Sequence, residues 1–430
     1  MKITGLITIL FIISSVAVKS QNLENLNKTV GLVNYRHNDR IKSVKVFKSG
    51  NVMSEPVILL NGNEILTVDF DDVSMFDESP RDLYYKVVHC DADWRESALM
   101  YSEYATGFEE NKIRTRTGSV NTSIRYTNYQ LNLPNSDTRL KISGNFLIKI
   151  FDDDTKELLL VRSFSITEAE VGITAFVEPY IGRGGMQQLS LRVNHQRLNV
   201  EDAYINLKIR VAQNSVRLTE VPNPTPVSVS QGSTDYNRSD KNIYPGGNEF
   251  RVFDIRNLTY SQQGVSHITQ VRGSYRAELL QDALKEGTQY INNPDANGKF
   301  MTGSAGSYNA NVQSDYVNVK FSLSSPFPLD GRVFVFGEFT DWALNPETEM
   351  YYNASTRSYD CDMLLKQGYY NYKYAVLNDN KPSFIQTEGN FGDTENSYSV
   401  YVYFRPSGER YDRLVGYQNI SSRASRPIFF

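Results

Sequence analysis

The strongest constraint on this chain is a period-two alternation of apolar and polar residues that recurs along its length. Residues 146–150, 205–211, 317–323 and 370–376 each place apolar side chains at every second position. Such a pattern predicts β-strands with one face on a core and the other toward water. Helical periodicity is nearly absent, and turn-forming Asn, Asp and Gly residues separate the alternating segments. We therefore predict an all-β fold, because a parallel α/β fold requires helices between its strands.

The length of 430 residues suggests about three domains, at roughly 150 residues each. Short strands with frequent turns are typical of sandwiches, so we predict tandem immunoglobulin-like β-sandwich domains. The predicted segments are an N-terminal sandwich at 25–167, a middle sandwich at 168–313, a C-terminal sandwich at 314–407 and a C-terminal arm at 408–430.

The first 20 residues predict a secretory signal peptide. Lys2 supplies the positive charge, Leu6 to Val18 is mostly apolar, and Val18-Lys19-Ser20 fits a small-residue cleavage site. The apolar run is shorter than the roughly 20 residues of a membrane span, and we expect no direct membrane span elsewhere. Export permits a disulfide between Cys90 and Cys361. We expect the two in different domains, however, and favour buried thiols.

The composition excludes several classes of protein. Lys and Arg number 45 against 49 Asp and Glu, whereas a nucleic-acid binder concentrates basic residues on its surface. Two Cys and four His leave little for a Cys-rich zinc module. No Gly-x-Ser-x-Gly, His-Glu-x-x-His or phosphate-loop pattern occurs. We therefore predict no enzyme activity, no metal, no cofactor and no nucleic-acid partner.

The densest polar cluster is His89-Cys90-Asp91-Ala92-Asp93-Trp94. These residue types are able to ligate a metal or to form a nucleophile and base. His89 and Cys90 are adjacent at a predicted strand end, however, so their side chains point to opposite faces. We favour a strand followed by an Asp-rich turn, with Trp94 filling a core. Asp295-Ala296-Asn297-Gly298 resembles the start of a calcium loop but lacks the distal Glu, and we predict a turn.

Two motifs in the predicted C-terminal sandwich resemble those of the glycogen- and starch-binding sandwich modules. They are Phe334 to Trp342, which contains Gly337-Glu338-Phe339-Thr340-Asp341-Trp342, and Leu364 to Tyr374. The resemblance implies a glycogen-binding-like, early-set β-sandwich. Sugar binding in that family uses two Trp residues. Trp342 matches the first, but residues 377–382 offer no second, so we do not expect carbohydrate binding.

Several further motifs occur in order along the chain. They are His89-Cys90-Asp91-Ala92-Asp93-Trp94, Ser143-Gly144-Asn145-Phe146, Gly247-Asn248-Glu249-Phe250-Arg251, Leu365-Lys366-Gln367-Gly368-Tyr369-Tyr370-Asn371-Tyr372, Thr394-Glu395-Asn396-Ser397-Tyr398 and Tyr411-Asp412-Arg413-Leu414-Val415-Gly416. Together they resemble the plug proteins of the type 9 secretion system, an exported family of the Bacteroidetes.

The resemblance implies a function. The plug would be a periplasmic subunit, peripheral to the outer membrane, that seals the periplasmic end of the giant outer-membrane β-barrel translocon until cargo arrives. The alternatives are an exported carbohydrate-binding module protein and an exported hydrolase, which predicts carboxylates clustered in a deep pocket.

The signature residues are expected to have mainly structural roles. This set comprises His89, Cys90, Asp91, Trp94, Gly144, Asn145, Gly247, Glu249, Phe250, Gly337, Lys366, Gly368, Tyr372, Glu395 and Asn396. Trp342, Asn248 and Arg251 are candidates for direct contact with the barrel if they are exposed. The alternative is that these three fix loops and cores.

Overall fold

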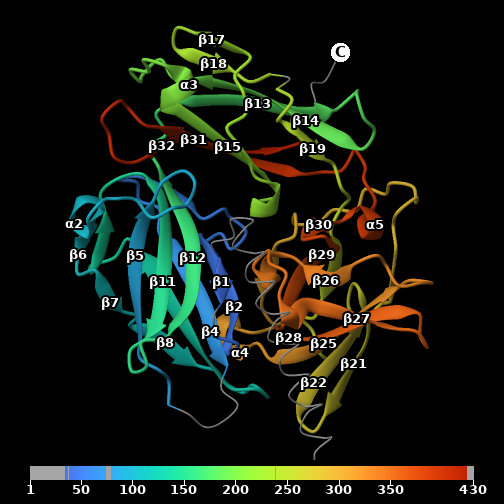
Figure 1. The fold of residues 1–430 in the computed structure, drawn as a ribbon. Coiled ribbons are helices and arrows are strands. Elements are labelled where there is room, and N and C mark those ends of the chain that lie inside the picture. Colours follow the sequence, from blue (N-terminus) through green and yellow to red (C-terminus); the bar gives the residue numbers. More distant parts are fainter. Residues whose placement is uncertain (1–33, 37, 74–78, 238, 424–430) are drawn as a thin grey trace, which may run out of the picture.

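A computed structural model describes residues 34–36, 38–73, 79–237 and 239–423, so the predicted signal peptide lies outside the described residues. The fold is all-β, arranged as three sandwiches (Figure 1), which confirms the predicted fold class. No helix in these described ranges is long and apolar enough to cross a membrane.

The first sandwich packs two antiparallel sheets face to face. One sheet contains β1 (Tyr35–Arg36), β12 (Leu158–Thr167), β11 (Gly144–Asp152), β5 (Leu83–Cys90) and β7 (Glu110–Lys112), with β3 (Val57–Leu59) parallel to β12. The other contains β2 (Ile41–Lys48), β4 (Leu66–Val73), β9 (Tyr126–Leu133) and β8 (Thr115–Gly118). Helix α2 (Tyr101–Tyr104) and the ribbon of β6 (Ala105–Gly107) and β10 (Thr138–Leu140) lie beside them.

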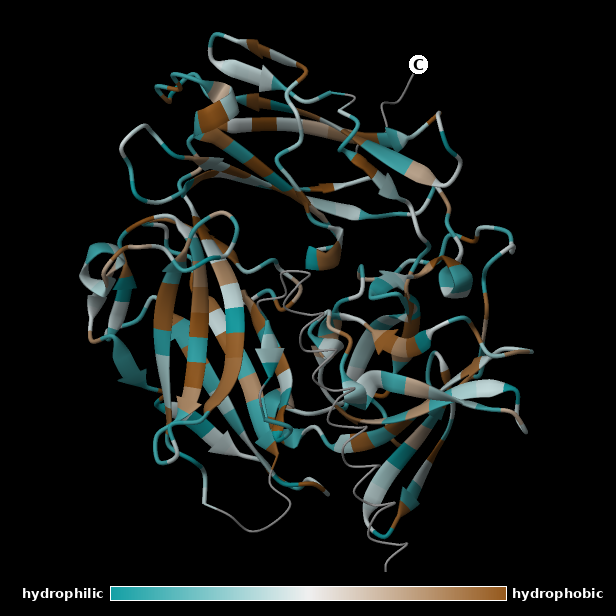
Figure 2. Ribbon diagram, in the orientation of Figure 1, coloured by the Kyte–Doolittle hydropathy of each residue, from teal (hydrophilic) through white to brown (hydrophobic). Residues whose placement is uncertain are grey.

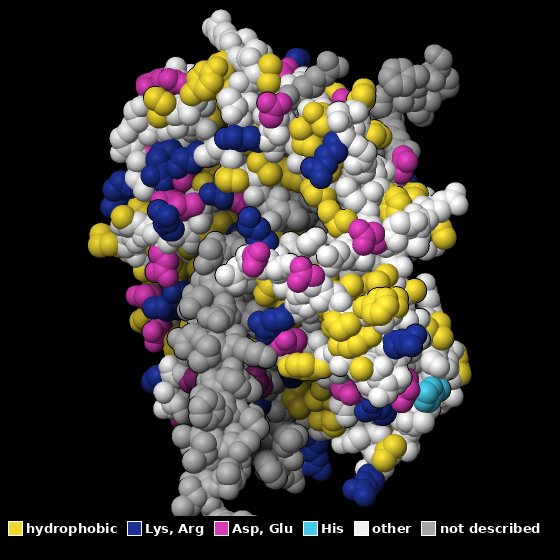
Figure 3. All heavy atoms as spheres, turned by 45° about the vertical axis from the view of Figure 1, so that its right-hand side comes forward, with side chains coloured by type: hydrophobic (Ala, Val, Ile, Leu, Met, Phe, Trp, Pro, Cys, Tyr) yellow, Lys and Arg dark blue, Asp and Glu magenta, His cyan; other side chains and the backbone are white. Residues whose placement is uncertain are grey.

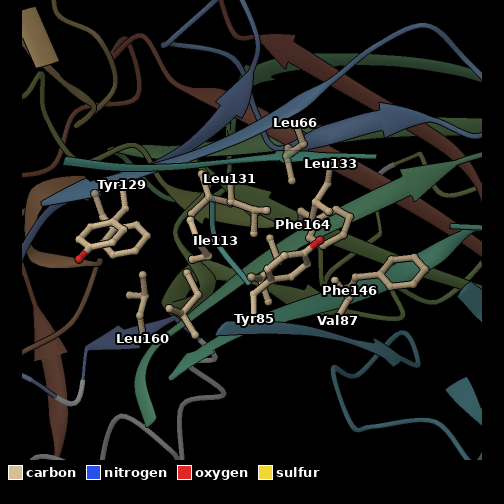
Figure 4. Packing of buried hydrophobic residues seen from close by; sticks show 14 of the residues in the cluster. Leu66, Tyr85, Val87, Ile113, Tyr129, Leu131, Leu133, Phe146, Leu160 and Phe164 are labelled. Atoms are coloured by element: carbon tan, nitrogen blue, oxygen red, sulfur yellow. The ribbon is translucent and has the colours of Figure 1, made fainter. Parts of the chain in front are cut away.

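The core of the first sandwich is formed by the alternate apolar residues of these strands. Figure 4 shows aromatic and aliphatic side chains from both sheets meeting in one layer. Phe146 stacks on Phe164 with ring centroids 5.3 Å apart, and both side chains are fully buried. Alternation is not strict along these strands (Figure 2): β12 begins with four apolar residues in succession, and residues on both of its faces are buried.

The middle sandwich is completed by strands from the end of the chain. One sheet contains β13 (Gly172–Pro179), β14 (Met186–Asn194), β18 (Ser233–Asp235), β17 (Ser228–Ser230) and β19 (Ile243–Pro245). The other contains β16 (Val221–Pro222), β15 (Leu207–Gln213), β31 (Ser397–Phe404) and β32 (Arg413–Ser421). Helix α3 (Ala203–Asn206) and the 3-10 turn η1 (Arg217–Thr219) flank β15.

In the third sandwich, 11 strands form one continuous hydrogen-bonded path that folds over on itself and encloses one core. Its order is β20 (Arg251–Asp254), β29 (Gly368–Asn378), β26 (Arg332–Phe336), β27 (Glu349–Asn353), β28 (Ser358–Lys366), β25 (Tyr316–Ser324), β22 (Ser274–Leu279) and β21 (Val265–Val271). β23 (Asp282–Ala283), β24 (Phe300–Thr302) and β30 (Lys381–Ser383) add to it. Short helices α4 (Ala310–Gln313), α5 (Ile385–Glu388), η2 (Glu338–Thr340) and η3 (Pro346–Thr348) connect the strands.

Strand pairing divides the chain differently from the predicted boundaries at 313 and 407. β20 to β24 precede residue 313 but pair within the third sandwich. β31 and β32 pair with each other and with β15, so the third sandwich is inserted into the middle one. Residues 413–421 therefore form a strand where the sequence suggested an extended arm. The reason is that β31 pairs with β15 along one edge and leaves its other edge open, and residues 413–421 cover that edge as β32.

Two strand predictions change in detail. Ile205 lies in α3 and is 71% exposed, because β15 begins only at Leu207. On β29, Asn371 and Lys373 were expected to face water, yet both are buried. Lys373 lies over the ring of Phe250 at 3.8 Å, so protein covers the second face of that strand as well.

Candidate functional site: the contacts between the three sandwiches

The three residues expected to touch a partner if exposed lie inside the protein. Trp342 is 8% exposed, Asn248 is 5% exposed and Arg251 is 7% exposed. The indole of Trp342 packs against Phe336 and Phe250, with ring centroids 5.6 and 6.2 Å away. Trp342 therefore offers no open stacking platform, and its role in this structure is packing.

Arg251 is the centre of a buried ionic cluster in the third sandwich. Its guanidinium donates to both carboxylate oxygens of Glu388 at 3.1 Å and to Asp282 at 2.8 Å. The hydroxyls of Tyr372 and Tyr374 donate to the other oxygen of Asp282 at 2.8 and 2.7 Å. The planar guanidinium, with five N–H donors, is able to bind these acceptors at the same time, whereas the ammonium of a Lys has only three donors and a different geometry.

The Gly247 to Arg251 motif lies where the chain leaves the middle sandwich, and it is held against the segment that returns. Phe391 N donates to Gly247 O at 2.7 Å, and Glu395 N donates to Glu249 Oε1 at 3.1 Å. Asn396 Nδ2 donates to Gly246 O at 2.8 Å. Two adjacent connections hydrogen-bonded to each other hold the third sandwich more rigidly than one linker would.

The remaining residues of these motifs support the same connection. Asn248 Nδ2 donates to Glu388 O at 2.8 Å, and Glu395 accepts from Ser421 at 2.6 Å. A Cβ on Gly337 would lie 2.6 Å from Asn371 O, and a Cβ on Gly368 would lie 2.5 Å from Met301 O. Glycine is therefore required at both positions because another backbone segment approaches closely.

His89 joins the first sandwich to the loop before β32. Its imidazole is 1% exposed and hydrogen-bonds to Ser97 Oγ at 2.9 Å and to Ser143 O at 3.2 Å. Burial lowers the pKa of His89 to about 4. Tyr411 packs edge-on against it, and a Cβ on Gly144 would lie 2.4 Å from Nε2. This histidine is a neutral packing group.

Cys90 lies on the other face of β5, as its position next to His89 predicted. It packs with Leu147 and Val161, and burial raises the pKa of its thiol to about 12. Cys90 and Cys361 are both free and buried, which confirms the prediction of two thiols. A Cys90–His89 nucleophile pair is incompatible with this geometry.

Asp91 and Asn145 contact the strands that complete the middle sandwich. Asp91 pairs with Arg405 at 2.6 Å, and Asp412 accepts from Ala92 N at 3.0 Å. Asn145 Oδ1 accepts from Tyr403 Oη at 2.9 Å. The motifs around these residues therefore form the contact between the first and middle sandwiches.

Trp94 was expected to fill a core, and it packs at the edge of one, against the hydrophobic cluster of Cys90, Leu147 and Val161. It is half-buried with φ 66°, and the guanidinium of Arg217 lies 3.6 Å from its ring centroid. The Asp-rich turn also brings the indole against η1 of the middle sandwich.

Buried ion pairs join the first sandwich to the third. Lys366 Nζ lies 2.7 Å from Asp71 Oδ2, and the two side chains are 2% and 0% exposed. The hydroxyl of Tyr316 donates to the same oxygen at 2.8 Å. Arg36 and Arg162 both pair with Asp341. Charge pairs that lose this much hydration persist only with good geometry and further hydrogen bonds, which both clusters have.

Sequence reasoning singled out Lys366 but did not consider Asp71, and it gave no role to Asp341 and Asp412, although both lie within motifs named above. One signal was present for Asp71, because it lies within Leu66-Thr67-Val68-Asp69-Phe70-Asp71-Asp72-Val73, an otherwise strand-like segment. Burial of a carboxylate requires a partner, so an acid at a core-facing strand position points to a buried pair. In the residues that the structure describes, no group of three or more His, Cys, Asp or Glu side chains is arranged to hold a metal ion.

Comparison with known proteins identifies relatives. A family model described as type 9 secretion system plug protein 1st domain matches residues 41–168, which span the strands of the first sandwich from β2 to β12. A crystal structure of a hypothetical protein from Parabacteroides merdae is 32% identical, with a TM-score of 0.87. The alignment covers 91% of this chain and 99% of that one.

Other solved structures are too different to inform the function. The C-terminal domain of the Streptococcus agalactiae AgI/II polypeptide BspA is 7% identical over 87% of this chain and 98% of that one, with a TM-score of 0.17. No curated protein matches this chain.

Proposed function

Because this chain belongs to the type 9 secretion system plug protein family, we propose that it closes the periplasmic end of the outer-membrane translocon when no cargo is engaged. The observation that carries the proposal is the family match over residues 41–168. The protein then acts as a steric gate, and its direct partner is the translocon barrel. Its working location is the periplasmic side of the outer membrane.

The contacts between the sandwiches support this role. Each sandwich touches the other two. The first sandwich contacts the middle one through Asp412 and contacts the third one through Asp71. Two hydrogen-bonded connections join the third sandwich to the middle one. A gate that blocks a wide pore must resist deformation. Three sandwiches held by buried ion pairs and paired connections form such a body.

The surface supports a reversible contact. On the face drawn in Figure 3, Lys, Arg, Asp and Glu side chains are mixed rather than separated by sign. Hydrophobic side chains are also exposed on that face. A surface of mixed charge suits contact with a wet pore wall, since a contact that must release differs from an obligate apolar interface. Carbohydrate binding has less support, because Trp342 is packed between Phe336 and Phe250.

The test is the permeability of the outer membrane and of the isolated translocon. We expect a strain lacking this chain to take up large antibiotics and dyes that the parent excludes, and the full chain to restore the barrier. A version lacking residues 1–20 serves as the matched control, since it should not be exported and should not restore the barrier. Purified translocon should conduct more without the protein than with it. Equal conductance in both preparations would refute the gate.

A further inference from the structure

The three sandwiches meet around one cavity of about 110 Å³. The first sandwich contributes Trp94, the middle one contributes Ser215, Arg217 and Tyr401, and the third contributes Lys299 and Trp342. A cavity of this size holds a few waters or one small ion. Its lining comes from all three bodies, so whatever occupies it contacts all three.

Arg217 carries a positive charge that is not matched by a close carboxylate. Its side chain is 15% exposed and lies flat against Trp94, 3.6 Å from the ring centroid. The nearest acid is Glu220 at 3.9 Å, which already pairs with Arg210. Within the described residues, no side-chain hydrogen bond is made by the Arg217 guanidinium. Stacking on an indole leaves the donor edge of an Arg free for a ligand.

The other charges that line the cavity are already paired. Four acids line the cavity. Glu55 pairs with Lys299 at 2.6 Å, and Glu220 pairs with Arg210. Glu338 pairs with Lys45 at 2.5 Å, and Asp341 pairs with Arg36 at 2.6 Å. Arg162 also pairs with Asp341. The lining carries four cations, Arg162, Arg210, Arg217 and Lys299, against these four acids, and Arg217 is the one without a carboxylate closer than 3.9 Å.

Two hydroxyl groups on the same lining also lack partners. Ser215 Oγ is buried and makes no hydrogen bond. The hydroxyl of Tyr401 makes none to any residue that the structure describes. Buried polar atoms are nearly always satisfied, so the buried Ser215 hydroxyl and the Arg217 donors on the same lining point to a bound acceptor. Donors arranged around a positive charge select an acceptor-only group with negative charge.

We propose that this cavity binds a small oxyanion, a carboxylate or phosphate group, on Arg217, Ser215 and Tyr401. The anion pairs with the Arg217 guanidinium and accepts hydrogen bonds from both hydroxyls. Because Trp94 fixes the guanidinium from the first sandwich while Arg217 belongs to the middle one, occupancy stabilises the arrangement of the sandwiches. This site is independent of any contact with the translocon.

The chain reports on this site directly, because it has only two Trp residues and both line the cavity. We would titrate the full mature protein with sodium phosphate and, separately, sodium acetate at constant ionic strength, with sodium chloride as the reference salt. We expect a saturable change in Trp fluorescence and a rise in melting temperature with phosphate, acetate or both. Calorimetric titration gives a second readout of the same binding.

Variants separate this site from general charge effects. Arg217→Gln should weaken anion binding at least about tenfold, whereas Arg192→Gln, an exposed arginine of the middle sandwich, should leave it unchanged. Ser215→Ala and Tyr401→Phe remove one hydroxyl each and should weaken binding by smaller factors, so they decide the matter if Arg217→Gln does not fold. A response to acetate alone identifies a carboxylate ligand, and a response to phosphate alone identifies a phosphate. No saturable binding of either anion, or equal binding by wild type and all three cavity variants, would overturn the proposal.

Discussion

Replacing Lys366 by Met tests whether the first and third sandwiches are held by a buried ion pair. Met keeps most of the side-chain stem but removes the ammonium. Lys366 Nζ contacts Asp71 Oδ2 and Asn311 O, both at 2.7 Å, and lies 4.3 Å from the ring centroid of Tyr126. Its removal leaves the carboxylate of Asp71 fully buried, with hydrogen bonds from the neutral donors Asn128 and Tyr316.

The expected cost follows from the burial of the pair. Breaking a buried pair by removing one partner costs about 3–5 kcal/mol, because the remaining charge is uncompensated. Lys366→Met should therefore lower the free energy of unfolding by about that amount. The double variant Lys366→Met/Asp71→Asn removes both charges and should recover at least about 2 kcal/mol of the loss.

Urea unfolding followed by circular dichroism and Trp fluorescence measures both quantities. Lys112→Met is the matched control. Lys112 also lies 2.7 Å from a carboxylate, that of Asp82, but the two side chains are 41% and 39% exposed. An exposed pair contributes about 1 kcal/mol or less. If Lys366→Met costs no more than Lys112→Met, or if the double variant shows no recovery, the buried-pair reasoning is wrong.

Three further predictions concern the first sandwich and the thiols. The pKa of His89 is about 4 in the folded protein, below its usual value near 6.5. Between these two pH values the unfolded chain binds a proton on His89 that the folded protein does not, so the free energy of unfolding should fall as pH drops from 6.5 to 4. Imidazole NMR that shows His89 titrating near 6.5 in the folded protein would contradict this. Gly144→Ala should destabilise the protein by about 2 kcal/mol or more, because φ is +136° and the added Cβ meets the imidazole, whereas Gly184→Ala, with nothing within 4 Å, should be nearly neutral in thermal unfolding. Cys90 and Cys361 should react with a thiol reagent only after denaturation, since burial raises both pKa values to about 12; rapid reaction of the native protein would refute this.

Local sequence patterns predicted the strands better than their partners. Alternation in 317–323 corresponds to β25, and the adjacent positions of His89 and Cys90 placed them on opposite faces of β5. Alternation does not encode which strand lies alongside. The pairing of Arg210 with Tyr401 joins segments 191 residues apart, and only the competition among all edges of the folded chain decides it.

The site was harder to predict for a related reason. Trp342, Asn248 and Arg251 have residue types common at interfaces, but burial is a property of the assembled fold. The cavity combines Trp94 with Arg217 and Lys299, from three separate segments. No short motif contains all three residues, so their spacing along the chain does not predict the cavity.

The insertion of the third sandwich orders the events of biogenesis. Because the polypeptide is synthesised from its N-terminus, β15 appears almost 190 residues before β31, its hydrogen-bonded neighbour. The first sandwich has all its strands early, but the middle sandwich stays incomplete until the last strands have been made. Removing only β32 would therefore damage a domain whose first strand begins at Gly172, and a purification tag belongs beyond Arg423, clear of that final strand.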